Sequence, residues 1–136
     1  MKPITLAVVG RIRSPLRSLD QAPRQGDEGA PEVWIDLDPG LAPAVGGLTA
    51  GDEIVVLTWL HLGDRDTLQV RPRDDATRPL TGVFATRSPD RPNPIGLHDA
   101  TVIDVQGRQL RVTGVEAVDG TPVLDIKPRL GPVETR

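Results

Sequence analysis

The chain contains no cysteine among its 136 residues, so disulfide bonds and thiolate metal sites are excluded. Aromatic side chains are almost as scarce, with two tryptophans, one phenylalanine and no tyrosine. Proteins that bind single-stranded RNA by stacking bases on aromatic side chains need several such platforms. This mode of RNA binding is therefore not expected.

Long apolar runs are missing as well. Residues 1–5 lack the apolar stretch of a signal peptide, and no segment approaches the length that spans a membrane. We therefore expect a soluble, cytoplasmic protein with no membrane partner. No metal is expected either, because the two histidines, His61 and His98, are far apart in the sequence. The Walker loop, the GxGxxG loop, the nucleophile elbow and the HExxH motif are also absent.

The charge balance is slightly acidic, with a formal net charge of −3 at pH 7. This balance argues against a protein that coats nucleic acid in general, since such proteins are usually basic. The charges are unevenly distributed, however. Residues 1–25 carry five basic side chains against Asp20 alone, and residues 65–91 carry six arginines against four aspartates. If these segments lie together in the fold they form one basic face; otherwise the arginines are scattered and solvated.

Residues 82–97 read GVFATRSPDRPNPIGL and form the most informative stretch of the chain. Pro89, Pro92 and Pro94 fall within six positions. Each fixes its own φ, removes a backbone donor and pushes the preceding residue toward extended conformations. The result is a stiff polar loop through which no helix or central strand can run. Such a loop loses little conformational entropy when it binds a ligand, although it could also be a simple connector.

The apolar positions elsewhere follow the pattern of short strands. Residues 32–37 alternate apolar and polar side chains, as a half-buried strand does. Residues 53–62 are almost continuously apolar, which predicts a strand buried on both faces. Gly107 is suited to the turn of a hairpin. Further strands are expected at 6–12, 67–70, 100–105, 109–115 and 123–126.

This pattern predicts an all-β fold with little helix. Only residues 41–48 could form a helical turn or two, and Gly46 and Gly47 would stop it. A chain of this length is expected to form one domain. Short strands separated by turn residues suit either an antiparallel barrel or a sandwich, and the pattern does not choose between them.

A second dense segment, residues 119–128, reads DGTPVLDIKP. Together with ATRSPDRPNPIG at residues 85–96 it resembles the TsaA-like family of tRNA methyltransferases, also called TrmO. Residues 22–26 and 59–61 resemble two further motifs of that family, and the resemblance extends over about residues 8–128. The sequence pattern predicts about seven or eight short strands and at most one short helix, and the resemblance implies that residues 1–136 form a single antiparallel β-barrel from them. The resemblance also implies a homodimer.

The same resemblance implies S-adenosylmethionine as the cofactor, bound without a Rossmann sheet. Arg87 is suited to a charge-assisted contact with the cofactor carboxylate. His61 taken alone would more often be a structural histidine, and Asp119 is equally well explained as a turn residue before Gly120. The cofactor-binding residues implied by the family motifs are Pro23, Arg24, Gln25, His61, Leu62, Arg87, Leu97, Asp119, Gly120, Thr121 and Pro122.

The leading functional hypothesis is methylation of N6 of threonylcarbamoyladenosine, the modified nucleoside beside the anticodon of tRNA. Two alternatives stay open, namely a small-molecule methyltransferase on the same barrel and a non-catalytic module that binds S-adenosylmethionine. Net acidity and scarce aromatic residues favour the small-molecule alternative. A nitrogen nucleophile must lose a proton during methylation. The base is not identified, and Glu116 and Asp125 are candidates only because they lie near the second motif.

Overall fold

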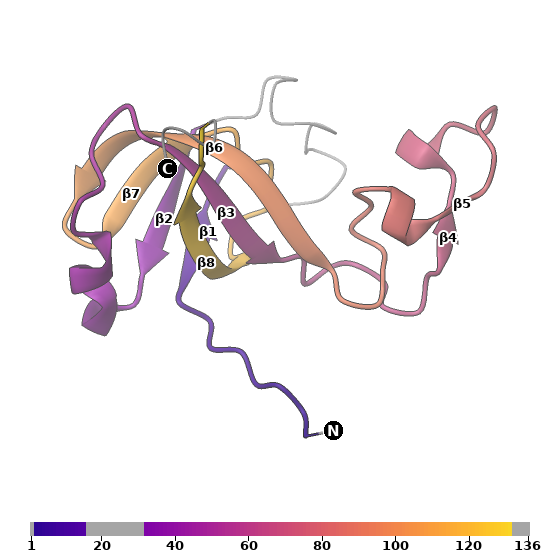
Figure 1. Ribbon diagram of the computed structural model, residues 1–136, viewed down its shortest axis with the longest axis horizontal. Helices are drawn as coiled ribbons and strands as arrows, with labels where there is room; N and C mark the ends of the chain where they lie inside the picture. Colours follow the sequence, from indigo (N-terminus) through magenta and orange to yellow (C-terminus); the bar gives the residue numbers. More distant parts are fainter. Residues whose placement is uncertain (1, 16–31, 132–136) are drawn as a thin grey trace.

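Six antiparallel strands form a closed barrel in the computed structural model, which describes residues 2–15 and 32–131 (Figure 1). Their order around the barrel is β1-β2-β7-β6-β3-β8. The expected all-β barrel is therefore confirmed, and the sandwich is ruled out. The six strands are β1 (Gly10–Arg13), β2 (Val33–Leu37), β3 (Glu53–Trp59), β6 (Ile95–Gln106), β7 (Gln109–Thr113) and β8 (Pro122–Pro128).

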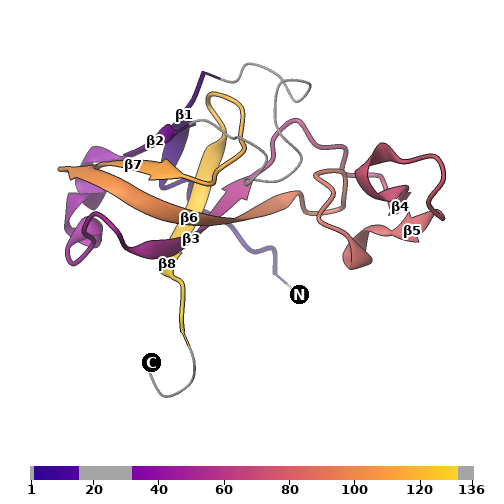
Figure 2. The same cartoon turned by 90° about the horizontal axis from the view of Figure 1, so that it is seen from above.

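The other two strands do not belong to the barrel. β4 (Gln69–Val70) and β5 (Thr81–Gly82) pair only with each other, in a small sheet that projects from one end of the molecule (Figures 1 and 2). We call residues 60–94, which connect β3 to β6 and contain this sheet, the arm. The expectation of seven or eight strands in one barrel is thus wrong in detail. Strands of two residues are too short to form part of the barrel wall.

The described residues contain three short 3₁₀ helices and no α-helix. The longest, η3 (Pro39–Val45), lies near the expected helical segment and ends before Gly46 and Gly47, as predicted. Pro43 within it has no backbone N–H and so cannot extend the hydrogen-bonded ladder. The other two, η4 (Pro72–Asp74) and η5 (Val83–Ala85), lie in the arm and were not anticipated.

The core lies inside the barrel and is built from every second residue of its strands. Ile35, Ile54 and Leu110 are completely buried there. Along β3 buried side chains alternate with half-exposed ones, and the outward positions are Val55, Leu57 and Trp59. The prediction that this strand is buried on both faces is therefore wrong. Its outer face is apolar in sequence but open to solvent in the single chain.

β6 starts earlier than expected and extends the proline-rich segment directly into the barrel. Ile95 follows the last proline and pairs with Trp59 of β3. The sequence predicts that no central strand runs through residues 82–97. This prediction is correct up to Pro94 and wrong for residues 95–97, which belong to β6. At its other end β6 forms the predicted hairpin with β7, where Gly107 adopts a positive φ of 61°.

The antiparallel topology gathers the sequence motifs at one end of the barrel. β1, β3 and β7 end on the side of the arm, and β2, β6 and β8 begin there. The described connections at this end include 60–94 and 114–121. Two candidate cofactor residues lie just inside the strands that follow, Leu97 on β6 and Pro122 on β8. The candidates within the two connections are His61, Leu62, Arg87, Asp119, Gly120 and Thr121.

Candidate functional site

A small hollow lies where two of these connections meet, at the arm end of the barrel. It has a volume of about 30 Å³, room for about two water molecules. Its walls combine residues of the segment after β3, the proline-rich loop and the segment before β8. The lining residues are Leu60, His61, Leu62, Gly63, Pro89, Glu116, Ala117, Val118 and Thr121.

His61 and Leu62 are both exposed at the rim of this hollow. The side chain of Leu62 is 52% exposed. His61 is not a buried structural histidine, so that alternative does not apply. The predicted cofactor residues from this segment are thus accessible to a ligand.

The proline-rich loop uses one of its two arginines to hold itself in shape. Arg91 donates hydrogen bonds to the carbonyl oxygens of Thr86, at 2.9 Å, and of Ser88, at 3.0 Å. Arg87, by contrast, is exposed. No hydrogen bond or ion pair joins Arg87 to any residue within 2–15 or 32–131. Its guanidinium is therefore available to a ligand, and its contact with the cofactor carboxylate stays a prediction.

Arg65 fastens the same loop from outside. Its Nε donates to the carbonyl oxygen of Pro92 at 2.8 Å, and its Nη2 donates to Asn93 Oδ1 at 3.0 Å. The guanidinium also lies over the ring of Trp59, 5.1 Å from its centroid. The loop is thus braced against the end of β3, and this brace was not apparent from sequence.

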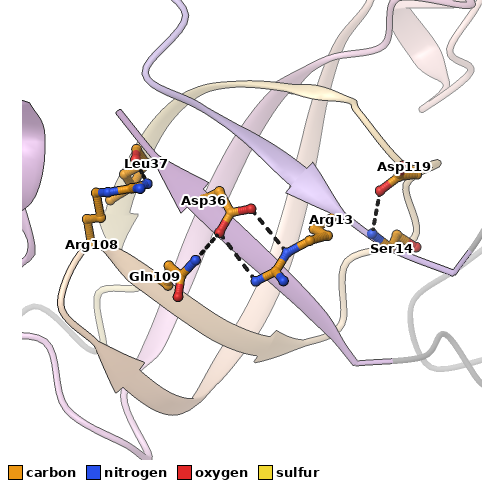
Figure 3. Close-up of polar contacts among 7 residues, drawn as sticks. All are labelled: Arg13, Ser14, Asp36, Leu37, Arg108, Gln109 and Asp119. Atoms are coloured by element: carbon orange, nitrogen blue, oxygen red, sulfur yellow. Dashed lines mark hydrogen bonds and ion pairs between the residues drawn. The ribbon is translucent and has the colours of Figure 1, made fainter. Parts of the chain in front are cut away.

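Residues 119–121 are anchored to the end of β1. Asp119 Oδ1 accepts a hydrogen bond from the backbone N–H of Ser14 at 2.9 Å (Figure 3). Arg11 donates to the carbonyl oxygen of Gly120 at 3.2 Å, and Gly120 has a positive φ of 86°. The buried hydroxyl of Thr121 donates to the Val118 carbonyl at 2.7 Å. The alternative of a turn role for Asp119 thus has direct support, and its cofactor contact stays a prediction.

Of the described candidates, Arg87, Leu97, Asp119, Gly120 and Pro122 do not line the hollow. Leu97 is 42% exposed on the outer face of β6, and Pro122 is buried at the start of β8. Pro23, Arg24 and Gln25 lie outside the described residues. The described part of the chain therefore brings His61, Leu62 and Thr121 together and leaves the other candidates around them.

Two residues that sequence reasoning did not place in a site lie directly behind the hollow. His98 points into the barrel end from β6 and is 5% exposed. Its Nε2 is 2.8 Å from the hydroxyl oxygen of Thr58, and its Nδ1 is 3.6 Å from an Oε atom of Glu116. Alternation along β6 would have placed His98 on the inner face, because Ala100 and Val102 are apolar at the same period.

The outer face of β1, β2 and β7 carries a separate polar network (Figure 3). Asp36 pairs with Arg13 at 3.1 Å and accepts a hydrogen bond from Gln109 at 2.8 Å. Arg13 and Arg111 also lie within 5.8 Å of the ring centroid of Trp34. The carboxylate offsets part of the positive charge, so this face is mixed rather than uniformly basic. Arg17 and Arg24 of the first basic segment lie outside the described residues.

Among residues 2–15 and 32–131, no three or more histidine, cysteine, aspartate or glutamate side chains are grouped so that they could hold a metal ion. No helix in the same part of the chain is long and apolar enough to cross a membrane.

Most of the chain matches one protein family. Residues 11–133 match the tRNA-methyltransferase O (TrmO) N-terminal domain. The chain belongs to this family. The resemblance read from the two motif segments is therefore confirmed.

Relatives of this TrmO-family chain occur in archaea and bacteria. A protein of Methanothermobacter thermautotrophicus, named a probable S-adenosyl-L-methionine-binding protein, is 45% identical over 92% of this chain and 89% of its own length. VirR of Rhizobium radiobacter bears the same description and is 40% identical over 91% of this chain and 70% of VirR.

The fold matches crystal structures of TrmO. One superposes with a TM-score of 0.76 at 30% identity, covering 99% of this chain and 63% of that chain. TrmO from Pseudomonas aeruginosa gives a TM-score of 0.75 at 27% identity, covering 99% of this chain and 61% of that chain. The chain thus spans about three fifths of the length of these TrmO chains.

Proposed function

We propose that this chain is an S-adenosylmethionine-dependent methyltransferase that acts on tRNA, at N6 of threonylcarbamoyladenosine beside the anticodon. The observation that carries the proposal is the convergence of family motif segments on one hollow at the arm end of the barrel. A tRNA substrate also implies a cytoplasmic protein. The names of the curated relatives support the choice of cofactor.

The described residues fit the chemistry of this cofactor. S-adenosylmethionine ends in an amino acid, and the exposed guanidinium of Arg87 is suited to bind its carboxylate. The mostly apolar walls around Leu60, Leu62 and Val118 are suited to the methyl group of the cofactor and, after transfer, to the thioether of the product. When bound, the cofactor supplies an activated methyl group. The protein then has to align the nucleophile with it and exclude water, which this stiff, braced loop favours.

The hollow in one chain is too small for a whole nucleoside, let alone for the cofactor. Leu97, a predicted cofactor residue, lies on the outer face of the barrel beside the half-exposed side chains of β3. We infer that a second copy of the chain covers this face and completes the pocket. This keeps the homodimer implied by the family resemblance as a proposal.

A small-molecule methyl acceptor is the second candidate. The outer polar network around Asp36 contains both positive and negative side chains, and the net charge of the chain is −3. A protein that binds RNA usually presents a basic surface. The charges of this chain therefore do not favour RNA over a small methyl acceptor. The third reading, binding without catalysis, agrees with relatives whose names speak only of binding.

Two measurements separate these candidates. Calorimetry with S-adenosylmethionine in the presence of EDTA should give binding without metal, and binding that EDTA abolishes would contradict the proposal. Labelled methyl groups should then appear in tRNA that contains threonylcarbamoyladenosine. Binding without any transfer to tRNA would favour the other two candidates, and turnover with a small acceptor would decide between them.

A further inference from the structure

Behind the hollow, three polar side chains from three segments form a continuous row. Thr58 on β3 is completely buried, His98 on β6 is 5% exposed, and Glu116 precedes β8 with its side chain 23% exposed. Only the glutamate reaches the hollow, where its residue forms part of the wall. The row therefore leads from the barrel interior to the site.

The hydroxyl of Thr58 determines which nitrogen of the His98 ring faces Glu116. It lies 2.8 Å from Nε2, so the ring's other nitrogen, Nδ1, is turned toward the carboxylate. When the hydroxyl donates to Nε2, the neutral ring carries its hydrogen on Nδ1. Nδ1 is buried and has no hydrogen-bond partner among residues 2–15 and 32–131, and at 3.6 Å the Glu116 oxygen is just beyond hydrogen-bonding distance. A small movement of the carboxylate completes this bond.

Gly96 of the proline-rich motif makes room for this row. A Cβ at Gly96 would overlap the Thr58 hydroxyl and lie 2.8 Å from His98 Nε2. The backbone φ of Gly96 is not in the left-handed region, so space rather than conformation requires the glycine. The proline-rich motif thus contributes to the site in two ways. Its exposed residues are accessible to a ligand, and its Gly96 leaves room for the buried Thr58 and His98 side chains.

Among the residues that the structure describes, Glu116 is the one carboxylate in the wall of the hollow. The other lining side chains are apolar, apart from Thr121 and His61. Asp125, the other candidate base, lies elsewhere, 3.1 Å from Lys127 on the same strand. The titratable side chains that the structure places around Glu116 are His98 behind it and His61 across the hollow.

We propose that Glu116 is the proton acceptor of the methyl-transfer step and that His98 is the positioning residue that orients it. This rests on the proposed function. The nitrogen–methyl bond forms as the carbon–sulfur bond breaks with its electron pair left on sulfur, and the proton of the nitrogen passes to an Oε atom of Glu116. Nδ1–H of His98 holds the carboxylate and stabilises its negative charge before the transfer. Thr58 is too deeply buried to touch substrate and serves to fix the ring.

The test compares Glu116→Gln with Asp38→Asn, a control at an exposed carboxylate that follows β2 at the opposite end of the barrel. Glu116→Gln should lower kcat for tRNA methylation by at least about 100-fold, the usual contribution of a general base. Its affinity for S-adenosylmethionine in calorimetry should stay close to that of the wild type. Asp38→Asn should change neither quantity. Full activity of Glu116→Gln would overturn the assignment while leaving the proposed function intact. A wild-type chain that transfers no methyl group would overturn both.

The role of His98 has readouts of its own. In the chain without cofactor, the His98 ring signals in ¹⁵N NMR should report a hydrogen on Nδ1. These signals should move in Glu116→Gln and not in Asp38→Asn. His98→Asn restores a donor near the position of Nδ1, so it should keep more activity than His98→Leu among variants of equal thermal stability. A ring with its hydrogen on Nε2, or equal activities of the two variants, would contradict the positioning role.

Discussion

Arg87 and Arg91 lie four positions apart in one loop and have different surroundings. Arg91 is part of the loop's own scaffold through the carbonyl oxygens of Thr86 and Ser88. Arg87 makes no contact of this kind with any described residue and is exposed. The spacing in the sequence does not distinguish them, because both arginines precede a proline-rich stretch. Their different contacts single out Arg87 for the ligand.

We expect Arg87→Ala to weaken S-adenosylmethionine binding by about 1.5–3 kcal/mol, the usual range for a hydrogen bond to a charged group. Calorimetry measures this directly. Arg71→Ala, which removes another exposed arginine of the arm, is the matched control and should leave the affinity unchanged. An unchanged affinity of Arg87→Ala would remove this residue from the site.

Gly96→Ala should destabilise the fold by about 1–3 kcal/mol, because the added methyl group has to displace the Thr58–His98 pair. Denaturant unfolding gives the difference. Gly82→Ala is the control, since a Cβ there meets nothing within 4 Å, and it should stay within about 0.5 kcal/mol of the wild type. Equal stabilities of the two variants would show that the space around Gly96 is not limiting.

At the scale of elements, the segment before β8 has two structural tasks. It closes the barrel end through hydrogen bonds between Ile12 and residues 120 and 121, at 2.7 and 2.9 Å. It also fixes the end of β1 through the side chain of Asp119. Both tasks hold the segment that carries Glu116 and Thr121, so the shape of the hollow depends on them.

Asp119→Ala should lower the free energy of unfolding by about 1–3 kcal/mol, since the Ser14 N–H loses a charged acceptor. Asp119→Asn retains an oxygen at this position and should lose less. Thermal or denaturant unfolding of both variants provides the comparison. If both variants were as stable as the wild type, the anchoring role would be wrong.

Strands were predictable from the sequence where one face is buried and the other polar. Residues 32–37 alternate in this way, and β2 lies almost where expected. The start of β6 and the solvent-facing side of β3 were not predictable. An apolar outer face has the same sequence pattern as a buried one, and a proline marks only where a strand cannot run, not where the next one begins. The two-residue pairing of β4 with β5 leaves no periodic signal.

The candidate site was predictable only as a set of motifs. The order of the motifs in the chain and the polar residues of the proline-rich loop indicated that this loop binds a ligand and that Arg87 contacts it. The contact between Thr58 and His98 joins positions 40 residues apart and depends on strand register, which the sequence does not reveal. Arg65 was likewise not recognisable as a brace, because its partners lie 27 and 28 positions away.

In the molecule as a whole, the part that contains the hydrophobic core and the part that carries the candidate binding site are different. The six-stranded barrel holds the core, and the arm end carries the loops around the hollow (Figures 1 and 2). Arginines of the arm are partly engaged with the arm itself. Arg71 donates to the carbonyl oxygen of Arg78, and Arg78 lies 3.8 Å from Asp75. Hydrogen bonds from Thr77 lower the pKa of the Asp75 carboxyl, which keeps this partner charged.

We expect the protein to be a homodimer through the apolar outer face of β3 and β6. Light scattering at micromolar concentration should give twice the 14.6 kDa mass of one chain. Leu97→Glu places a charge in this face and should shift the mass toward that of the monomer, with weaker cofactor binding. Gln106→Glu adds the same charge at an exposed position at the far end of β6 and should leave the mass and the cofactor binding unchanged. A monomeric wild type would contradict the dimer and the completion of the pocket by a second copy.

Mass spectrometry of tRNA nucleosides tests the central claim most directly. tRNA that contains threonylcarbamoyladenosine is incubated with S-adenosylmethionine and with either the wild-type chain or Arg87→Ala, then digested to nucleosides. We predict that threonylcarbamoyladenosine gains the mass of one methylene group with the wild type, that fragmentation places it on N6, and that Arg87→Ala slows the gain. Threonylcarbamoyladenosine that stays unmodified while the protein demonstrably binds S-adenosylmethionine would contradict the account.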